Sequence, residues 1–467
     1  MRRPNLWAQA IAVLASLCLV GVSAAPAAAQ SWPFSKASAS QAQKPLSRAQ
    51  RLQIVQALVA APSHGLPAYD VGLDSSDEQL IAAVTDFASA LHAGRMQDRW
   101  TGDWHLRPEP YDAQGAFERA RSKNKVRQWL DQLGPRHAGY HSLRGALIRY
   151  REIADTGGWK KLSPKATLKV GSRGMAVMAL RERLGIEYPG PLPDGDQAIF
   201  DESLSHALAL EQERLGVPVT GKLDKATIAA LNVPVEARIA TIEANLERER
   251  WLPAELPRTR IEMNIPAYWL EVHRRGEVAL AMKTVVGRPS DPTPIFQDVM
   301  HSMVFNPPWN VPQKIAQRDI LPRASKDKTY LIKNDYQITE DGRVVQKAGP
   351  KSALGKVKFN LDNPFAIYFH DTPNKALFDQ HARAFSNGCI RLENAAALAE
   401  LALAGDRYWN EATLQNVFAA GETIETDASR SMPVFIVYRT AFVEDGRVNF
   451  RDDVYGWDSK LRQILAA

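Results

Sequence analysis

The chain has very few cysteines. Only Cys18 and Cys389 occur among its 467 residues. We interpret residues 1–29 as a cleaved secretory signal, because Arg2 and Arg3 precede an apolar run that ends in small residues. The mature chain would then hold one thiol, which excludes an internal disulfide framework. Cys389 is therefore either a small buried apolar side chain or a reactive group.

The sequence also lacks the motifs of two classes of peptide-cleaving enzyme. No His-Glu-x-x-His spacing is present, so a zinc peptidase is excluded and we expect no metal and no other cofactor. Ser122 with Lys125, and Ser325 with Lys328, give a Ser-x-x-Lys spacing. The companion Ser-Asp-Asn and Lys-Thr-Gly elements of serine penicillin-binding enzymes are absent, so we treat both pairs as coincidental.

The chain has no large excess of charge and no second long apolar run. Its formal net charge is +6, and removing Arg2 and Arg3 leaves +4 (6 minus 2). This balance is too small to indicate nucleic-acid binding, but it suits an anionic polymer of the cell envelope. We expect an exported, periplasmic protein that contacts the membrane only if the apolar segment stays uncleaved as an anchor.

The patterns along the chain predict an α+β multidomain protein. Helical periodicity dominates the first third, with Ser76 as a helix cap, whereas β-rich alternation begins near residue 259. The hairpin of the last segment is expected to turn at Asp445 and Gly446. The expected parts are a flexible tether (30–45), a helical scaffold (46–166), a small three-helix bundle (167–235), a mostly β catalytic domain (259–426) with a lid insertion (about 324–361), and a C-terminal hairpin and tail packing on that domain (427–467).

The predicted bundle resembles a known wall-binding module. Its stretches "LKVGSRGMAVMALRERLG" and "GVPVTGKLDKATIAAL" are similar to the peptidoglycan-binding domain type built on repeated helix and turn units. The resemblance implies contact with peptidoglycan. A spacer bundle without a ligand is the alternative, because the pattern mainly reports core positions and turns.

The surroundings of Cys389 carry a second resemblance. A thiol attacks acyl groups when a base stands beside it, and His370 lies 19 residues earlier (389 minus 370) at the end of an apolar strand-like run. The pair "YFHDTPNKALF" and "AFSNGCIRL" resembles the catalytic signature of the L,D-transpeptidases, the YkuD-like domain. The upstream "FNPPWNVPQKI" resembles the substrate-groove segment of the same family. The order of these blocks is similar to the large periplasmic branch of the family.

The resemblance implies a role for each residue near the thiol. Cys389 is the expected nucleophile and His370 the expected base, oriented by a backbone carbonyl or else by Asp371 or Ser386. Asn387 departs from the family, in which many members have histidine before the glycine. The expected oxyanion and support residues are Gly388, Ser386, Asn387 and Arg391, and the expected groove residues are Asn306, Trp309 and Tyr368.

These residues predict a covalent acyl transfer. Cys389 would attack the amide between the third and fourth residues of a peptidoglycan stem, release D-alanine, and pass the acyl group to an acceptor amine to form a cross-link. The expected partners are donor and acceptor stem peptides, with carbapenems as inhibitors. A hydrolase that uses the same site and a non-catalytic peptidoglycan-binding module remain open as alternatives.

Overall fold

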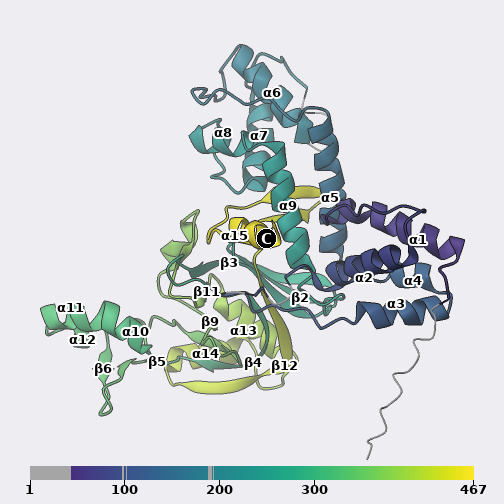
Figure 1. The fold of residues 1–467 in the computed structure, drawn as a ribbon. Coiled ribbons are helices and arrows are strands. Elements are labelled where there is room, and N and C mark those ends of the chain that lie inside the picture. The colour runs from purple at the N-terminus through teal and green to yellow at the C-terminus, as the bar shows by residue number, and fades with distance from the viewer. Residues whose placement is uncertain (1–43, 97–98, 101, 188–191, 193, 467) are drawn as a thin grey trace, which may run out of the picture. The chain divides into compact units, whose positions relative to one another are not determined.

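The structure is a computed structural model, and it describes residues 44–96, 99–100, 102–187, 192 and 194–466 (Figure 1). The predicted signal (1–29) and nearly all of the predicted tether (30–45) lie outside these residues. In the part of the chain that is described, no helix is both long and apolar enough to cross a membrane.

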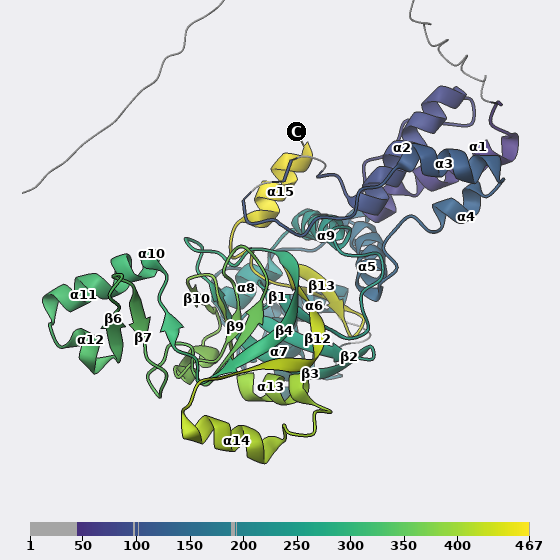
Figure 2. The same ribbon diagram turned by 90° about the horizontal axis from the view of Figure 1, so that it is seen from below.

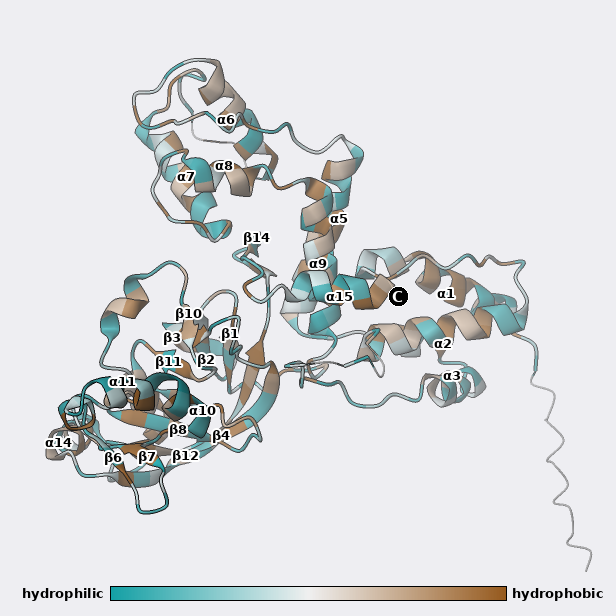
Figure 3. Ribbon diagram, turned by 60° about the vertical axis from the view of Figure 1, so that its left-hand side comes forward, coloured by the Kyte–Doolittle hydropathy of each residue, from teal (hydrophilic) through white to brown (hydrophobic). Residues whose placement is uncertain are grey.

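The N-terminal region is helical, as the sequence predicts. Ser76 begins α2 with a capping box, in which its hydroxyl accepts from the Gln79 N–H and the Gln79 side chain accepts from the Ser76 N–H. Apolar residues at three- and four-residue spacing give α2 one buried face. Figure 3 colours the apolar residues of the ribbon brown. The helices are α1 (Arg48–Val59), α2 (Asp77–Ala93), α3 (Ala113–Ser122), α4 (Val126–Leu130) and α5 (Ala138–Asp155).

A unit of three short helices follows, which confirms the predicted bundle. Its helices are α6 (Met175–Glu187), α7 (Glu202–Arg214) and α8 (Lys225–Leu231). The side chains of Asp201 and Asp224 cap α7 and α8 at their N-termini. The next helix, α9 (Val235–Glu249), packs on α5 and leads into the β-rich domain.

The β-rich domain is a barrel. Its strand order is β10-β3-β11-β9-β8-β4-β12-β1-β2, and β2 also pairs with β3, which closes the sheet on itself. The strands are β1 (Arg260–Asn264), β2 (Trp269–Arg274), β3 (Glu277–Gly287), β4 (Phe296–Phe305), β8 (Val357–Leu361), β9 (Phe369–His370), β10 (Ala384–Ser386), β11 (Ile390–Leu392) and β12 (Ile424–Val437).

The barrel interior is apolar and sets which side chains face outward. Phe359 of β8, Phe369 of β9 and Ile390 of β11 are fully buried in one core cluster. Because successive side chains of a strand alternate between faces, the residues beside them point to the opposite face. Helices α13 (Ala395–Leu403) and α14 (Glu411–Ala420) pack apolar side chains on the same core (Figure 2).

The segment between β4 and β8 folds into a small body of its own. Its core contains Val311, Ala316, Ile320 and Val344. This inserted segment starts earlier than the predicted lid (about 324–361). It also ends earlier, because residues 357–361 form barrel strand β8. Its elements are β5 (Trp309–Asn310), α10 (Gln313–Ile315), η2 (Ala316–Ile320), α11 (Leu321–Lys326), α12 (Tyr330–Lys333), β6 (Tyr336–Ile338) and β7 (Val344–Gln346).

The C-terminal segment differs from the prediction in two ways. Strand β12 crosses residue 426, where the domain boundary was expected. The hairpin of β13 (Ala441–Glu444) and β14 (Arg447–Phe450) does turn at Asp445 and Gly446, both at positive φ. Its apolar side chains, however, lie in the core of the helical region instead of the barrel. The final helix, α15 (Trp457–Ala466), does pack on the barrel core, as do the β12 residues of this segment.

Candidate active site

The expected nucleophile and base lie on adjacent strands. Strands β9 and β11 run parallel, with Phe369 opposite Ile390 and His370 opposite Arg391. Continuing this register by one residue places Cys389 opposite Tyr368. Because Phe369 and Ile390 fill the barrel core, the other four side chains share the outward face. The sequence alternation thus brings Cys389, Tyr368, His370 and Arg391 together.

His370 is fixed in one tautomer. Its side chain is buried, and Nδ1 lies 2.5 Å from the backbone carbonyl oxygen of Asp371. Nδ1 therefore carries the proton, and Nε2 is left as the acceptor. The Asp371 carboxylate is not the orienting group, because it binds the Lys375 ammonium at 2.7 Å. Burial, and next the charge of Arg391, lower the pKa of His370 to about 3.

The Cys389 thiol sits among hydrogen-bonding groups of β9 and the loop before it. It donates to the Ala366 carbonyl at 3.7 Å. The Tyr368 hydroxyl and the Tyr368 N–H are donor groups that lower the pKa of the thiol, and the Trp309 indole lowers the pKa of the Tyr368 hydroxyl. Burial raises the pKa of the thiol, and these donors together with nearby cations oppose that rise. The thiol is therefore neutral at rest.

The loop before Cys389 is held from both sides. The Ser386 hydroxyl donates to the Cys389 carbonyl at 2.5 Å and accepts from the Gly388 N–H at 3.1 Å. The Thr293 hydroxyl donates to the Gly388 carbonyl at 2.7 Å. Gly388 has φ +109°, and a Cβ there would lie 3.0 Å from the Ile367 side chain. Only glycine fits this position without displacing Ile367.

Asn387 ties this loop to the inserted segment. Its side-chain oxygen accepts hydrogen bonds from Arg288 and, at 2.5 Å, from Arg318 of η2. Asp291 binds Arg318 at 3.0 Å and Lys314 at 2.6 Å. The four side chains around Asn387 form what we call the loop latch: Arg288, Asp291, Lys314 and Arg318.

Comparison with known proteins identifies the domain that holds this site. Residues 258–410 match the model of the L,D-transpeptidase catalytic domain, YkuD. Residues 41–147 match a scaffold domain, and residues 173–231 match the model described as "Putative peptidoglycan binding domain". The chain carries an L,D-transpeptidase catalytic domain.

One curated relative supports this assignment. A Haemophilus influenzae protein named "Putative L,D-transpeptidase" is 34% identical over 220 residues, which cover 43% of this chain and 45% of that protein. The chain thus spans just under half the length of that relative.

Solved structures of L,D-transpeptidases are also similar to the chain. The catalytic domain of the Enterococcus faecium L,D-transpeptidase acylated by ertapenem is 14% identical, covering 39% of this chain and 99% of that one, with a TM-score of 0.20. L,D-transpeptidase 3 of Mycobacterium tuberculosis is 14% identical, and the match covers 39% of this chain and 61% of that one, with a TM-score of 0.21.

Two predicted roles in the L,D-transpeptidase domain need correction. Asn306 is not a groove residue, because its buried amide donates to the carbonyls of Val417 at 2.8 Å and Glu422 at 3.0 Å. The Gly388 N–H is not free for an oxyanion, because it donates to Ser386. Among the described residues, the Cys389 N–H donates to no acceptor, so it is the better candidate.

The structure adds residues that the motif did not indicate. Lys358 of β8 lies opposite His370, so it belongs to the same outward face. Thr293 and Arg288 contact the nucleophile loop from the segment after β3. Tyr455 supports Thr293, since its hydroxyl accepts from the Thr293 N–H at 3.2 Å. These positions are distant in sequence from Cys389, and only the strand pairing brings them to it.

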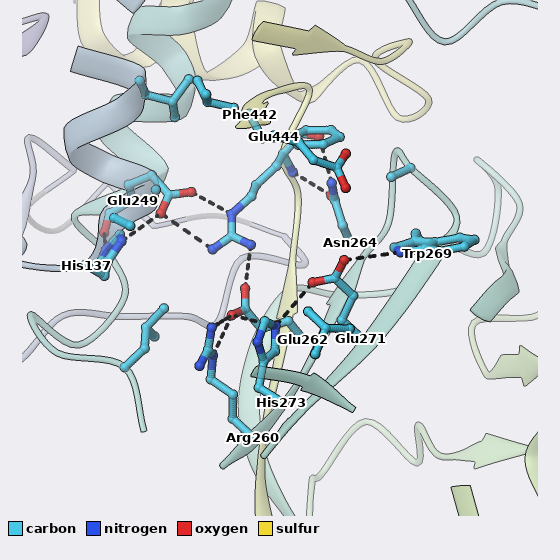
Figure 4. A pocket seen from close by; sticks show the side chains of 18 of the residues that line it. His137, Glu249, Arg260, Glu262, Asn264, Trp269, Glu271, His273, Phe442 and Glu444 are labelled. Atoms are coloured by element: carbon cyan, nitrogen blue, oxygen red, sulfur yellow. Dashed lines mark hydrogen bonds and ion pairs between the residues drawn. The ribbon is translucent and has the colours of Figure 1, made fainter. Parts of the chain in front are cut away.

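A cavity of about 890 Å³ lies away from the thiol. It is lined by residues of β1, β2, the α9 end and the hairpin (Figure 4). Several of its charged groups pair with one another: Arg439 binds Glu249 and Glu262, each at 2.6 Å, and Arg260 also binds Glu262. Because the partners satisfy each other, we interpret this cavity as a polar joint of the fold and not as the reaction site. In the described part of the chain, no group of His, Cys, Asp and Glu could hold a metal ion.

Proposed function

We propose that the chain is a peptidoglycan L,D-transpeptidase in which Cys389 is the nucleophile and His370 the general base. The observation that carries the proposal is the placement of both residues on one barrel face, with His370 Nδ1 bound to the Asp371 carbonyl and Nε2 left to accept a proton. This face belongs to a domain that matches the L,D-transpeptidase family model.

The first step is acylation of the thiol. His370 Nε2 takes the thiol proton, and Sγ attacks the carbonyl carbon of the amide between the third and fourth stem residues. The Cys389 N–H stabilises the oxyanion of the tetrahedral intermediate. The C–N bond then breaks, His370 returns its proton to the leaving nitrogen, and D-alanine departs. The product is a thioester on Cys389.

The second step transfers the acyl group. An amine of an acceptor stem attacks the thioester, and His370 removes a proton from the attacking nitrogen. The C–S bond breaks, the thiol is re-formed, and the new amide is the cross-link. Water in place of the amine would give a hydrolase. We expect the folded segment attached to the nucleophile loop through Arg318 to favour transfer by limiting the access of water.

Both groups of the pair are neutral before attack. His370 stays neutral above about pH 3, so Nε2 can accept a proton at neutral pH. The thiol is also neutral because burial raises its pKa. Attack therefore requires proton transfer within the pair, and the Tyr368 hydroxyl stabilises the sulfur as it gains charge.

The remaining parts suit work on the cell wall. We assign the three-helix unit to peptidoglycan binding, in line with its family match. The expected location is the periplasm. Because related enzymes are known acylated by ertapenem or bound to imipenem, we expect carbapenems to acylate Cys389 here.

Product analysis tests the proposal. The purified chain without residues 1–29 is incubated with disaccharide-tetrapeptide fragments, beside a Cys389→Ala control, and the products are weighed by mass spectrometry. A dimer lacking one D-alanine, absent with the control, is expected. Tripeptide monomer alone would indicate a hydrolase. No change in either sample would leave a binding module as the better interpretation.

A further inference from the structure

Two cations without a counter-charge flank the proposed base. In the described part of the chain, neither the Lys358 ammonium nor the Arg391 guanidinium takes part in a hydrogen bond or an ion pair, and Arg391 Nε is buried. Lys358 is half-buried, as is Arg391. Charged groups that lose water normally gain a counter-charge, so two such cations in one site point to an anionic ligand.

The strand register places both cations at the reacting atoms. Lys358 and Arg391 lie on either side of His370, in one row across β8, β9 and β11. Neighbouring strands are about 4.8 Å apart, so the two backbones are separated by roughly 10 Å. The Lys358 side chain leans toward the row of Cys389, because its ammonium lies 4.6 Å from the centre of the Tyr368 ring.

The carboxylates around this row are engaged elsewhere or lie further away. Asp371 binds Lys375 and the Lys356 N–H. Glu425 raises the pKa of Lys358, yet it makes no ion pair with it and accepts from Asn360 at 3.2 Å. Burial lowers the pKa of both Lys358 and Arg391, which agrees with cations that lack a counter-charge.

We propose that Lys358, together with Arg391, binds the terminal carboxylate of the donor stem and so makes a free C-terminal D-alanine a requirement for acylation. This inference rests on the proposed function. The carboxylate belongs to the leaving residue, one carbon beyond the nitrogen that departs. A pair of cations beside Cys389 and His370 holds that residue in place and thereby aligns the scissile carbonyl with the sulfur. Lys358 is thus a specificity-determining residue.

The test compares two donors that differ only in this carboxylate. One tetrapeptide ends in D-alanine and the other in D-alaninamide, and acylation of Cys389 by each is followed by mass spectrometry. We expect the unmodified chain to prefer the acid by about 10- to 100-fold in kcat/KM, the range of a charged hydrogen bond. In Lys358→Gln the preference should fall to a few-fold, because acylation by the acid donor slows much more than acylation by the amide donor. Lys358→Arg should keep most of it.

Two controls separate this role from others. Lys356→Gln removes a lysine from the same stretch whose ammonium lies instead over the Phe418 ring, and it should leave the preference unchanged. Alkylation of Cys389 by iodoacetamide, a reagent without a carboxylate, should slow much less without Lys358 than acylation by the acid donor does, because Lys358 is only one of several groups that lower the pKa of the thiol.

The outcomes are distinguishable from failure of the proposed function. If the unmodified chain acylates with neither donor, the proposed function is wrong. If it acylates but Lys358→Gln slows both donors equally, or slows alkylation to the same degree, then Lys358 supports the thiol and does not select the substrate. A wild-type preference that survives the substitution would also overturn the inference.

Discussion

At the scale of single residues, burial determines the charge of the reacting pair. It lowers the pKa of His370 and raises that of Cys389, so both effects disfavour a thiolate–imidazolium pair at rest. The Tyr368 hydroxyl and N–H lower the pKa of the thiol, so they favour negative charge on the sulfur in the proposed reaction. In the proposed mechanism, the site would therefore stabilise charge during the reaction instead of before it.

The pH profile of acylation should reveal this neutral pair. A histidine with an ordinary pKa would lose its base function below about pH 6.5. Because the pKa of His370 is lowered to about 3, kcat/KM should stay flat from pH 8 to pH 5. The measurement is acylation of Cys389 at each pH, with circular dichroism confirming that the chain stays folded. A fall centred near pH 6.5 would show that His370 titrates normally.

Ala366 holds a strained backbone next to the thiol. Its φ is +54°, although it is not glycine, and its carbonyl accepts the Cys389 thiol. Left-handed backbone costs an alanine about 1 kcal/mol or more, so Ala366→Gly should raise the stability of the barrel by about 0.5–1 kcal/mol. Ala353→Gly, at a position without positive φ, should lower it. Thermal unfolding of both variants checks the signs, and equal destabilisation would show that Ala366 is not strained.

The motif predicted a chemistry for the candidate site but not the contacts of its residues. Cys389 and His370 stand in a recognisable order in the sequence, and strand alternation is enough to place them on one face. The hydrogen-bond partners of these groups could not be predicted from the motif. The Asn306 amide donates to a carbonyl of α14, and the Gly388 N–H donates to the side chain of Ser386. Lys358 was missed because only the pairing of β8 with β9 brings it to His370.

At the scale of elements, the loop latch joins the inserted segment to the nucleophile loop. Its contacts are polar and partly exposed: the Arg318 side chain is 35% exposed, whereas Asp291 is 9% exposed. Exposed ion pairs are weak and screened by salt, so the latch can open without disturbing the barrel. The neutral amide of Asn387 suits this arrangement, since it accepts from two arginines and adds no charge.

Arg318→Gln should loosen the inserted segment. The substitution removes the hydrogen bond to Asn387 and the ion pairs to Asp291 and Asp319. We expect faster cleavage within residues 313–346 in limited proteolysis, and a larger share of hydrolysed product relative to cross-linked dimer because water enters the site.

Lys326→Gln, an exposed change in α11 of the same segment, provides the matched control. It should cleave at the wild-type rate. High salt should bring the wild type closer to Arg318→Gln, because screening weakens the same contacts. Identical cleavage of all three proteins would mean that the latch does not hold the segment.

Local signals predicted the elements better than their docking. The Ser76 cap and the Asp445–Gly446 turn are encoded by short stretches, and both are present. The docking of the hairpin is not encoded locally. Any apolar surface would suit the hairpin side chains Ala441, Val448 and Phe450. The hairpin packs on the helices through buried arginines of α7 and α9, which lie more than 190 residues earlier in the sequence.

At the scale of the whole chain, a buried charge cluster ties the three-helix unit to the C-terminal hairpin. Arg214 of α7 binds Glu187 of α6 at 3.0 Å and also Glu211, and it donates to the Val448 carbonyl of β14 at 2.7 Å. Arg447 of β14 binds Glu211 at 2.8 Å. The proposed wall-binding unit is thereby fastened to a strand pair that follows the barrel in sequence.

Arg214→Met should weaken this junction strongly. It leaves Glu187 and Glu211, each 2% exposed, with fewer counter-charges, and breaking a buried pair costs about 3–5 kcal/mol. Burial raises the pKa of Glu187, but the charges of Arg214 and Arg183 outweigh it and lower the pKa to about 2. This carboxylate therefore contributes stability above its ordinary pKa of 4.5, and the contribution is lost as the pH falls toward 2.

The difference between wild type and Arg214→Met should consequently be largest at pH 7 and shrink below pH 4.5. Urea unfolding at several pH values measures it, and hydrogen exchange of residues 441–450 shows whether the hairpin loosens. Arg127→Met, which removes an exposed pair with Asp131, should cost no more than about 0.5 kcal/mol at any pH. If Arg214→Met cost no more than this control, the cluster would be dispensable, and the hairpin would be held by its apolar side chains alone.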